Sequence, residues 1–354
     1  MQNVFYKGYS DSEKSSELTM PSSTNKKGKV HLTIHKFCPI FIRDILSDLS
    51  KKLHIRTSLF INGVLLVSIF FISCGIFEPE QPDYHNKILF SSRRSGKFQL
   101  YMMNPDGTDI EQITSGEYWH NFGKWSPNAQ KIVCNTEEET TTAGMEMVVM
   151  NTDGSERKLL GMGNQMSWYP DGSKIIFSYW PGAEVAIFDI KLYSVGSNGK
   201  NMKVLSDKYV GNHTISPDGQ HIAFPMDHDS STGITILDFP GFDNPKYIGP
   251  FGLADAEYSR KGDEIAFSRH IGKELITDIY IINSDGSNLR KITNSTSEKI
   301  YIEPCWSPDG DRIIFIENVS GINEEWFLYM INKDGTDLNR VIDDNTVRSC
   351  DWSK

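Results

Sequence analysis

No short motif in residues 75–354 would position a nucleophile, a catalytic metal or a nucleotide. The stretch lacks a G-x-S-x-G elbow, an H-E-x-x-H pair and a G-x-x-x-x-G-K-[ST] loop, which are the spacings of serine hydrolases, zinc peptidases and P-loop proteins. The Asp-Gly pairs invite comparison with calcium loops, but around Asp285-Gly286 two EF-hand ligand positions hold Ile281 and Ile292. We therefore expect no enzyme activity, no cofactor and no metal.

Six polar residues recur three or four positions before a residue that is usually aromatic. They are Asn121, Gln165, Asn212, Asp255, Glu303 and Arg348. If the repeats surround a common axis, these side chains line the mouth of the axial channel and are the candidate ligand contacts. The alternative is a channel that holds only ordered water. His120 and His213 do not occupy equivalent repeat positions, so we expect no shared metal site.

A tight turn follows the aromatic residue in most repeats. In the segment W-S-P-D-G that begins at Trp306, Ser307 and Gly310 suit the first and last positions of a type I turn, and Pro308, before Asp309, fixes φ at the second position. Related turns follow Trp125, Trp168, Ile215 and Tyr258. One strand is therefore predicted to end at the aromatic residue and the next to begin just after the turn.

An apolar triplet follows these turns at regular intervals. The six triplets begin at Ile88, Ile132, Ile175, Ile222, Ile265 and Ile313, with spacings of 44, 43, 47, 43 and 48 residues. Each triplet is followed by another strand, a turn that is Asp-Gly or Asn-Gly in five of the six repeats, and a last strand. Four strands in such a period form a propeller blade, because a single small sheet must stack against neighbours to bury both faces.

The ends of the repeat region predict how the ring closes. The chain ends with an aromatic strand at Trp352 that has no triplet after it, and the first triplet at Ile88 has no aromatic strand before it. Together they complete one blade, so we predict an all-β, six-bladed propeller over residues 86–354 whose terminal strands share a blade. The tryptophans in register are expected to pack between blades: Trp125, Trp168, Trp306 and Trp352.

The sequence W-S-P-D-G-x-x-I, followed by a strand and N-x-D-G, resembles the WD40-like repeat called PD40. This repeat occurs in the propeller of the Tol-system protein TolB and in the propellers of prolyl oligopeptidase and dipeptidyl peptidase IV relatives. The resemblance covers residues 86–354 and implies a propeller that presents loops to a partner. No segment of the sequence resembles the separate α/β domain of TolB or the hydrolase domain of the peptidases, so peptidase activity is not implied.

The charge of the repeat region excludes some partners. Residues 1–74 contain 10 Lys and Arg against 5 Asp and Glu, so of the formal net charge of -10 the remaining residues carry -15. Such an acidic region repels nucleic acid and anionic membrane surfaces. We therefore expect a neutral or basic partner and no nucleic acid.

Residues 51–73 are predicted to be a signal peptide. Lys51, Lys52 and Arg56 precede a long apolar run, which is the arrangement of a secretory signal. The alternative is an uncleaved membrane anchor. Both place the remainder of the chain on the far side of the membrane from these basic residues.

The segment Phe71-Ile-Ser-Cys-Gly75 resembles a bacterial lipobox, which implies lipid attachment at Cys74 and a linker over residues 74–85. By the sorting habit of lipoproteins, Gly75 implies an outer membrane if the source has one. Residues 1–50 are rich in Ser, Thr and Lys and are predicted to be disordered or, if translation starts nearer Lys51, not translated.

These observations predict an exported, lipid-anchored, monomeric propeller that faces the periplasm or the cell exterior. Its predicted function is a non-enzymatic scaffold that binds an envelope protein or a peptide. Two alternatives remain: a structural envelope component without a discrete ligand, and a glycan-binding or glycan-cleaving propeller that uses the channel carboxylates of Asp255 and Glu303 as acid and base.

Overall fold

The structure is a computed structural model that describes most of the chain from residue 83 onward. The described residues are 83–137, 145–179, 191–207, 211–228, 231–249, 253–271, 276–296, 299–319 and 325–354. The predicted disordered segment 1–50, the predicted signal 51–73 and Cys74 lie outside these residues. Within them, no helix has the length and apolar character needed to cross a membrane.

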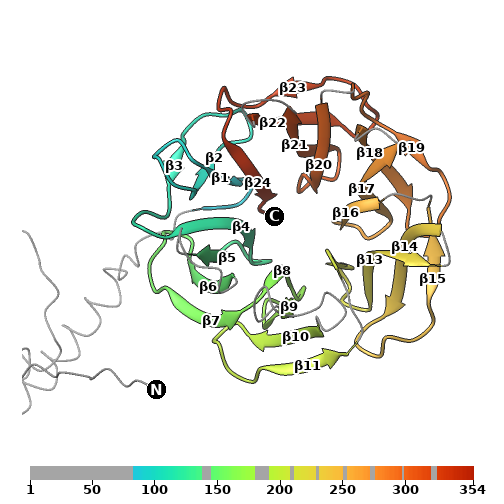
Figure 1. Ribbon diagram of the computed structural model, residues 1–354, viewed down its shortest axis with the longest axis horizontal. Coiled ribbons are helices and arrows are strands. Elements are labelled where there is room, and N and C mark those ends of the chain that lie inside the picture. The colour runs from blue at the N-terminus through green and yellow to red at the C-terminus, as the bar shows by residue number, and fades with distance from the viewer. Residues whose placement is uncertain are drawn as a thin grey trace, which may run out of the picture. The chain divides into compact units, whose positions relative to one another are not determined.

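The described residues form a ring of antiparallel sheets around a central axis (Figure 1). Each repeat contributes an inner strand, and these strands are β4 (Trp119–Trp125), β8 (Asn164–Trp168), β12 (Thr214–Ile215), β16 (Leu253–Tyr258), β20 (Lys299–Trp306) and β24 (Val347–Trp352). The second strands carry the apolar triplets and are β1 (Ile88–Ser92), β5 (Lys131–Glu137), β9 (Lys174–Tyr179), β13 (His221–His228), β17 (Glu264–Ile271) and β21 (Arg312–Val319).

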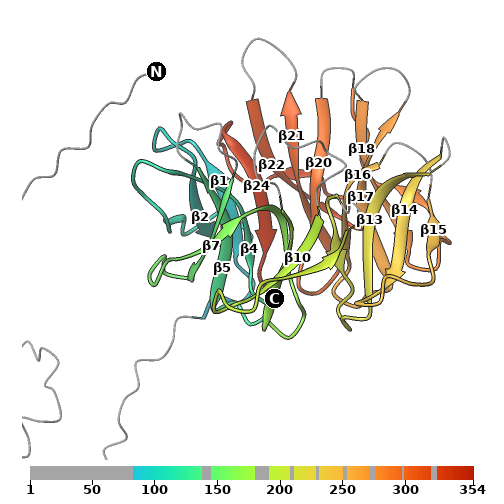
Figure 2. The same ribbon diagram turned by 60° about the horizontal axis from the view of Figure 1, so that its bottom comes forward.

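Two further strands complete each repeat towards the rim. The third strands are β2 (Gln99–Met103), β6 (Glu146–Asn151), β10 (Lys191–Gly196), β14 (Ser231–Asp238), β18 (Ile276–Asn283) and β22 (Glu325–Asn332). The outer strands are β3 (Glu111–Gln112), β7 (Lys158–Met162), β11 (Lys203–Ser206), β15 (Lys246–Ile248), β19 (Arg290–Lys291) and β23 (Asn339–Arg340). From the side, strands of neighbouring repeats such as β18, β20 and β21 stand next to one another around the ring (Figure 2).

The hydrogen-bonded sheets differ from the prediction of six separate four-stranded sheets. Four sheets have four strands each, and the last two repeats join into one eight-stranded sheet. The junction is a single parallel pair between Thr277 of β18 and Ile300 of β20. The described architecture is therefore an all-β propeller whose last two repeats are joined through their backbones.

The ring closes through its terminal strands, as the sequence predicted. Strand β24 pairs antiparallel with β1, with Trp352 opposite Ile88 and Cys350 opposite Phe90. The side chain of Ser353 adds a further link, because its hydroxyl accepts a hydrogen bond from the backbone N–H of Lys87 at 2.7 Å. First and last strands thus belong to one four-stranded sheet.

Aromatic residues at the ends of the inner strands pack against the preceding repeat. Trp306 and Trp352 are fully buried, and Trp125 and Trp168 nearly so. Trp352 lies in an apolar cluster with Ile314 and Leu328 of the repeat before it. The clusters around Trp125, Trp168 and Trp306 likewise contain side chains of the preceding repeat.

The predicted turn after Trp306 is also present. The Gly310 N–H donates to the Ser307 carbonyl at 3.0 Å, and Gly310 adopts φ +75°, which favours glycine. The hydroxyl of Ser307 donates to Asp309 and accepts from the Arg312 N–H at 2.9 Å. Pro308 and Asp309 therefore serve a structural purpose, fixing where the second strand begins.

Candidate functional site

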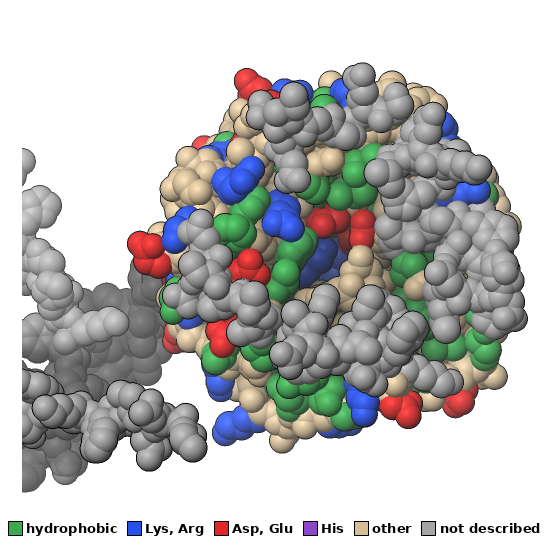
Figure 3. Space-filling view, in the orientation of Figure 1, with side chains coloured by type: hydrophobic (Ala, Val, Ile, Leu, Met, Phe, Trp, Pro, Cys, Tyr) green, Lys and Arg blue, Asp and Glu red, His purple; other side chains and the backbone are tan. Residues whose placement is uncertain are grey.

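A cavity of about 490 Å³ lies on the axis of the ring. Residues from all six inner strands line it, so no single sheet forms it alone. Figure 3 shows acidic side chains beside the hollow near the centre of the ring, with basic side chains close by. This channel is the candidate functional site.

The residue three positions before the end of each inner strand lines the cavity in every repeat. We call this set the mouth ring: Phe122, Gln165, Asn212, Asp255, Glu303 and Ser349. The residue directly before the strand end forms a second set, which we call the middle ring: Lys124, Ser167, Thr214, Glu257, Cys305 and Asp351. All members of the middle ring except Cys305 line the cavity.

Four of the six predicted channel residues line the cavity, and two do not. Gln165, Asn212, Asp255 and Glu303 are in its wall, while Asn121 and Arg348 lie outside it. Asn121 is buried, with 6% of its surface exposed. The guanidinium of Arg348 lies over the rings of Phe98 and Phe122, at 5.5 and 5.7 Å. Asn121 and Arg348 stand four positions before the end of their strands, whereas the residues that line the cavity in every repeat stand three positions before it.

A bulge in the inner strands explains the error. In β4 the register shifts between Asn121 and Lys124, and Phe122 adopts φ +52°. Gln165 and Glu303 have nearly the same backbone, at φ +52° and +53°, and also lie in bulges. A bulge re-aims the side chain that it carries, so counting alternate residues along a regular strand misplaces the channel face.

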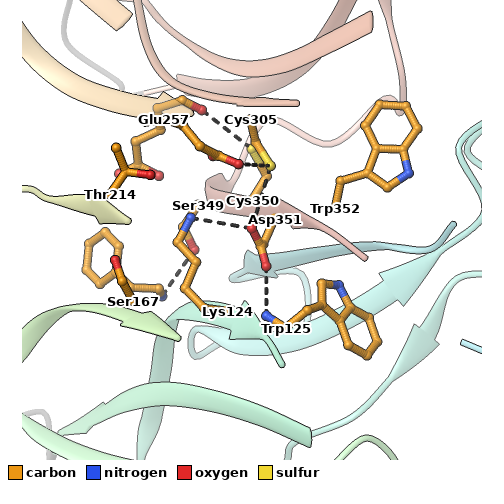
Figure 4. Close-up of polar contacts among 12 residues, drawn as sticks. Lys124, Trp125, Ser167, Thr214, Glu257, Cys305, Ser349, Cys350, Asp351 and Trp352 are labelled. Carbon is orange, nitrogen blue, oxygen red and sulfur yellow. Dashed lines mark hydrogen bonds and ion pairs between the residues drawn. The ribbon is translucent and has the colours of Figure 1, made fainter. Parts of the chain in front are cut away.

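The middle ring was not predicted from the sequence. Its members stand immediately before the last residue of each inner strand, but their side chains carry four different groups: ammonium, hydroxyl, carboxylate and thiol. Figure 4 shows these side chains converging from different inner strands. A position that varies in type but keeps its place in every repeat is detected only once the repeats are aligned in space.

Asp351 is the centre of the contacts in the middle ring. Its Oδ2 accepts the backbone N–H of Trp125 at 2.7 Å, and its Oδ1 lies 3.5 Å from Lys124 Nζ. The single S–H of Cys305 lies within hydrogen-bonding distance of two acceptors, Asp351 Oδ1 at 3.5 Å and Glu257 Oε1 at 3.7 Å. These contacts join the last two repeats to the first and second across the closure of the ring (Figure 4).

The carboxylates of the middle ring are balanced by Lys124 within the ring and by Arg260 next to it. Burial lowers the pKa of Lys124, but the carboxylates of Asp351 and Glu257 outweigh it and raise the pKa overall. Burial raises the pKa of Glu257, and Lys124 and Arg260 oppose that shift. Two cations thus face two carboxylates, which leaves little net charge to attract a ligand.

Three atoms of this ring have the spacing of metal ligands. A carboxylate oxygen of Glu257, Cys305 Sγ and a carboxylate oxygen of Asp351 lie within 4.8 Å of one another. However, burial and both carboxylates raise the pKa of the Cys305 thiol, which disfavours the thiolate that binds metal. The ammonium of Lys124 already provides the positive charge, so the arrangement fits an ion-pair network better than a metal centre.

Side chains of both rings also form hydrogen bonds to backbone groups of the neighbouring repeat. Thr214 Oγ1 accepts the Tyr258 N–H at 3.3 Å, and Ser349 Oγ accepts the Phe122 N–H at 3.1 Å. Ser167 donates to the His213 carbonyl at 2.8 Å. Several channel side chains therefore tie one repeat to the next, which is a structural task.

The mouth ring contains an acidic pair from neighbouring repeats. Asp255 Oδ1 accepts from Asn212 Nδ2 at 2.6 Å, and its Oδ2 accepts the Glu303 N–H at 3.1 Å. Burial first, and then the charge of Asp255, raise the pKa of Glu303 to about 8. No hydrogen bond or ion pair to the Glu303 carboxylate is formed by any other described side chain. Among the described residues, the Glu303 carboxyl group in the mouth ring is thus left without a partner.

The fold and this channel define the chain as a β-propeller with an acidic axial mouth. No family model matches the sequence. An uncharacterized protein of Agrobacterium fabrum is 28% identical over 116 residues, which is 28% of this chain and 40% of that relative. The chain therefore aligns with less than half the length of this curated relative.

Solved structures that resemble the chain include TolB proteins. The crystal structure of TolB from Acinetobacter baumannii matches with a TM-score of 0.62 and 19% identity, covering 80% of this chain and 70% of that chain. A protein described as a TolB from Agrobacterium tumefaciens matches with a TM-score of 0.55 and 17% identity, covering 74% and 90%. At such identities the likeness shows a shared propeller fold.

Proposed function

We propose that this protein is an exported propeller that binds a protein or peptide partner in the cell envelope through the mouth of its axial channel, without catalysing a reaction. The observation that carries the proposal is the carboxyl group of Glu303 beside Asp255 in the wall of an axial cavity, where no other described side chain pairs with it. A polar group that is buried in part and left without a partner is the kind of feature that a ligand satisfies. The shared fold with TolB supports a binding role.

Several finer features belong to this proposal. We count each half of the eight-stranded sheet as one blade, which gives six blades. The proposed location outside the cytoplasmic membrane rests on the basic and apolar pattern of residues 51–73 and on the lipobox-like Cys74. A monomer anchored through this cysteine, with residues 86–354 as the binding domain, is the arrangement that the sequence supports best.

A pull-down with cross-linking from envelope fractions tests the proposal. The full chain is compared with the double variant Asp255→Asn, Glu303→Gln, which preserves shape but replaces both carboxyl groups with amides. A matched control, Glu111→Gln with Asp343→Asn, makes the same chemical changes on exposed outer residues. We expect a defined set of partners to be captured by the wild type and the control and lost from the channel variant.

Two results would refute this function. Equal capture by the channel variant, with unchanged thermal unfolding, would remove the channel mouth from recognition. Absence of any specific capture by the wild type would remove the scaffold role itself.

A second function has one specific observation in its favour. Glycosidases need one carboxyl group protonated near neutral pH beside an ionised one, and the raised pKa of Glu303 next to Asp255 has this form. Incubation of the protein with soluble envelope polysaccharides, followed by reducing-end assay, decides the matter. Product release that Glu303→Gln abolishes would establish this activity in place of the scaffold.

A further inference from the structure

We propose that the mouth ring binds a cationic group that only donates hydrogen bonds, a primary ammonium or a guanidinium, between Asp255 and Glu303. This inference rests on the proposed function and specifies its partner: the guest is a basic side chain of the bound protein or peptide. Lysine and arginine side chains offer three and five donors respectively and no acceptor. The argument for such a guest comes from the acceptors, charges and neighbours of the mouth.

The first observation is that Asp255 is held in a fixed orientation. Its two oxygens accept from Asn212 Nδ2 at 2.6 Å and from the Glu303 N–H at 3.1 Å. The hydroxyl of Ser268 donates to Oδ2 at 3.3 Å. Several lone pairs of Asp255 are thereby used, which leaves too few oxygens for a calcium site, where six to eight ligands are typical. An ammonium or guanidinium group needs fewer acceptor oxygens than calcium does.

The second observation concerns Glu303. Its backbone is anchored to Asp255 through its own N–H, and φ +53° within the bulge fixes the direction in which the side chain leaves the strand. Its carboxylate has no hydrogen-bonded or ion-paired partner among the described residues. The side chain is therefore positioned by the fold but unused by it.

Lys124 and Arg348, the cations near Glu303 in the part of the chain that the structure describes, are engaged elsewhere. Lys124 Nζ lies 3.5 Å from Asp351 Oδ1 in the middle ring. The guanidinium of Arg348 lies over the aromatic rings of Phe98 and Phe122. Both lower the pKa of Glu303 from a distance, but burial and Asp255 outweigh them. The mouth is left with an excess of negative charge.

A third observation is independent of the acidic pair. Asn135 lines the same cavity, is 3% exposed, and has an Oδ1 without a hydrogen-bond donor. His213 also lines it, is 7% exposed, and has an Nε2 without a partner. Burial lowers the pKa of His213 to about 4, outweighing the backbone groups of Gly211 and Ile176 that act in the opposite direction, so the ring is neutral. Unsatisfied acceptors require a guest that donates.

The unsatisfied donors of the cavity wall lie at the other end of the inner strands. They are Trp125 Nε1 and Arg260 Nε, at the strand end and two residues beyond it. The mouth ring stands three residues earlier, or roughly 10 Å along a strand. The channel is therefore graded, with acceptors at the mouth and donors at the far end, and a cation fits only the mouth.

Binding of such a cation should displace a proton. The carboxyl group of Glu303, with its pKa raised by burial and by Asp255, is partly protonated near neutral pH. The groups that face it are Asp255 of β16, Lys124 of β4 and Arg348 of β24. The guest prefers the ionised form, so affinity is expected to rise by up to about tenfold per pH unit below pH 8 and to level off above it.

Calorimetric titration of the full chain at low salt tests the inference. The probes are the blocked peptide acetyl-Gly-Gly-Lys-Gly-Gly-amide, the same peptide with acetylated lysine, and n-butylamine. We expect the lysine peptide to bind wild type and the control Glu111→Gln alike, and Glu303→Gln at least tenfold more weakly. The affinity for wild type should rise between pH 6.5 and 8, and that for Glu303→Gln should stay flat.

The other outcomes separate this inference from the proposed function. Equal binding of the acetylated peptide would overturn the cation site while leaving peptide recognition intact. Binding of n-butylamine as tight as that of the lysine peptide, with the same loss in Glu303→Gln, would support the cation site but make free amines its guests, against the proposed function. Failure of both cationic probes to bind wild type, or displacement by calcium chloride beyond the effect of ionic strength, would overturn the inference.

Discussion

The mouth ring and the middle ring lie within a few residues of each other on the same six strands, yet they treat charge in opposite ways. In the middle ring, Lys124 faces Asp351, and the thiol of Cys305 bridges Asp351 to Glu257. In the mouth ring, Asp255 raises the pKa of Glu303, and no described cation pairs with either carboxyl group. The carboxylates of the middle ring are balanced by Lys124 and the neighbouring Arg260, whereas those of the mouth ring have no such counterpart among the described residues.

This difference separates what holds the ring together from what is available for binding. A buried ion pair that loses one member leaves an uncompensated charge, so a balanced network is part of the structure. The carboxyl group of Glu303, which has no partner among the described residues, forms no stabilising contact, and its partial burial lowers the stability of the fold. Its retention is understandable if a ligand supplies the missing donor.

The largest effect is expected from breaking the middle ring with Asp351→Ala. This change removes the acceptor of the Trp125 N–H and the partner of Lys124. We expect a loss of about 2–4 kcal/mol in the free energy of unfolding, below the about 3–5 of a fully buried pair, because the Lys124 side chain is 37% exposed. Urea unfolding monitored by tryptophan fluorescence measures it.

Two controls accompany this variant. Asp351→Asn retains an acceptor for Trp125 and should lose roughly half as much. Asp343→Ala breaks an ion pair with Arg340 from a side chain that is 98% exposed and should change stability by less than about 0.5 kcal/mol. Similar values for Asp351→Ala and Asp343→Ala would contradict the view that the middle ring is structural.

Titration of Glu303 in the mouth ring should make the free energy of unfolding depend on pH. The pKa of Glu303 is raised to about 8 in the folded state, against about 4.3 for an unfolded glutamate. Between these values the folded state holds a proton that the unfolded state has lost, so stability falls as pH rises. The slope is at most about 1.4 kcal/mol per pH unit, and the effect is complete above pH 8.

Glu303→Gln should remove this contribution. The measurement is the difference in unfolding free energy between wild type and variant at pH 5, 6, 7, 8 and 9, in which the other titrating groups largely cancel. The variant should become increasingly more stable than wild type up to about pH 8. A constant difference across this range would show that the carboxyl group of Glu303 titrates normally.

The smallest effect is expected from a neutral link between repeats. Thr214→Val keeps the shape of the side chain but removes the acceptor for the Tyr258 N–H. We expect a loss of about 1 kcal/mol. Thr214→Ser keeps the hydroxyl and should stay close to wild type in the same unfolding assay; equal losses in both variants would assign the effect to packing instead.

The propeller fold and its closure were predictable because they depend on repetition. Strand patterns and turns recur at spacings of 43 to 48 residues, and Trp352 and Ile88 provide complementary halves of one sheet. The parallel pair of Thr277 and Ile300, which joins the last two repeats, was not predictable, since it depends on how closely two finished sheets approach. No local pattern encodes that distance.

The channel was predicted in part. Gln165, Asn212, Asp255 and Glu303 lie in the cavity wall as expected, but Asn121 and Arg348 do not. The bulges at Phe122 and Glu303 involve positive φ in residues other than glycine, and nothing in their types announces it. The side-chain face of a strand cannot be counted reliably through a bulge.

By itself the sequence determined the repeat, the turns, the buried aromatic positions and the joining of the two ends, because these follow from local backbone preferences and hydrophobic spacing. Only the tertiary structure decided which polar residues meet. Lys124 and Asp351 are far apart in the chain, and so are Asn212, Asp255 and Glu303, yet each set lies together at the axis. Ring closure sets these distances, and with them which charges are paired and which stay free to bind.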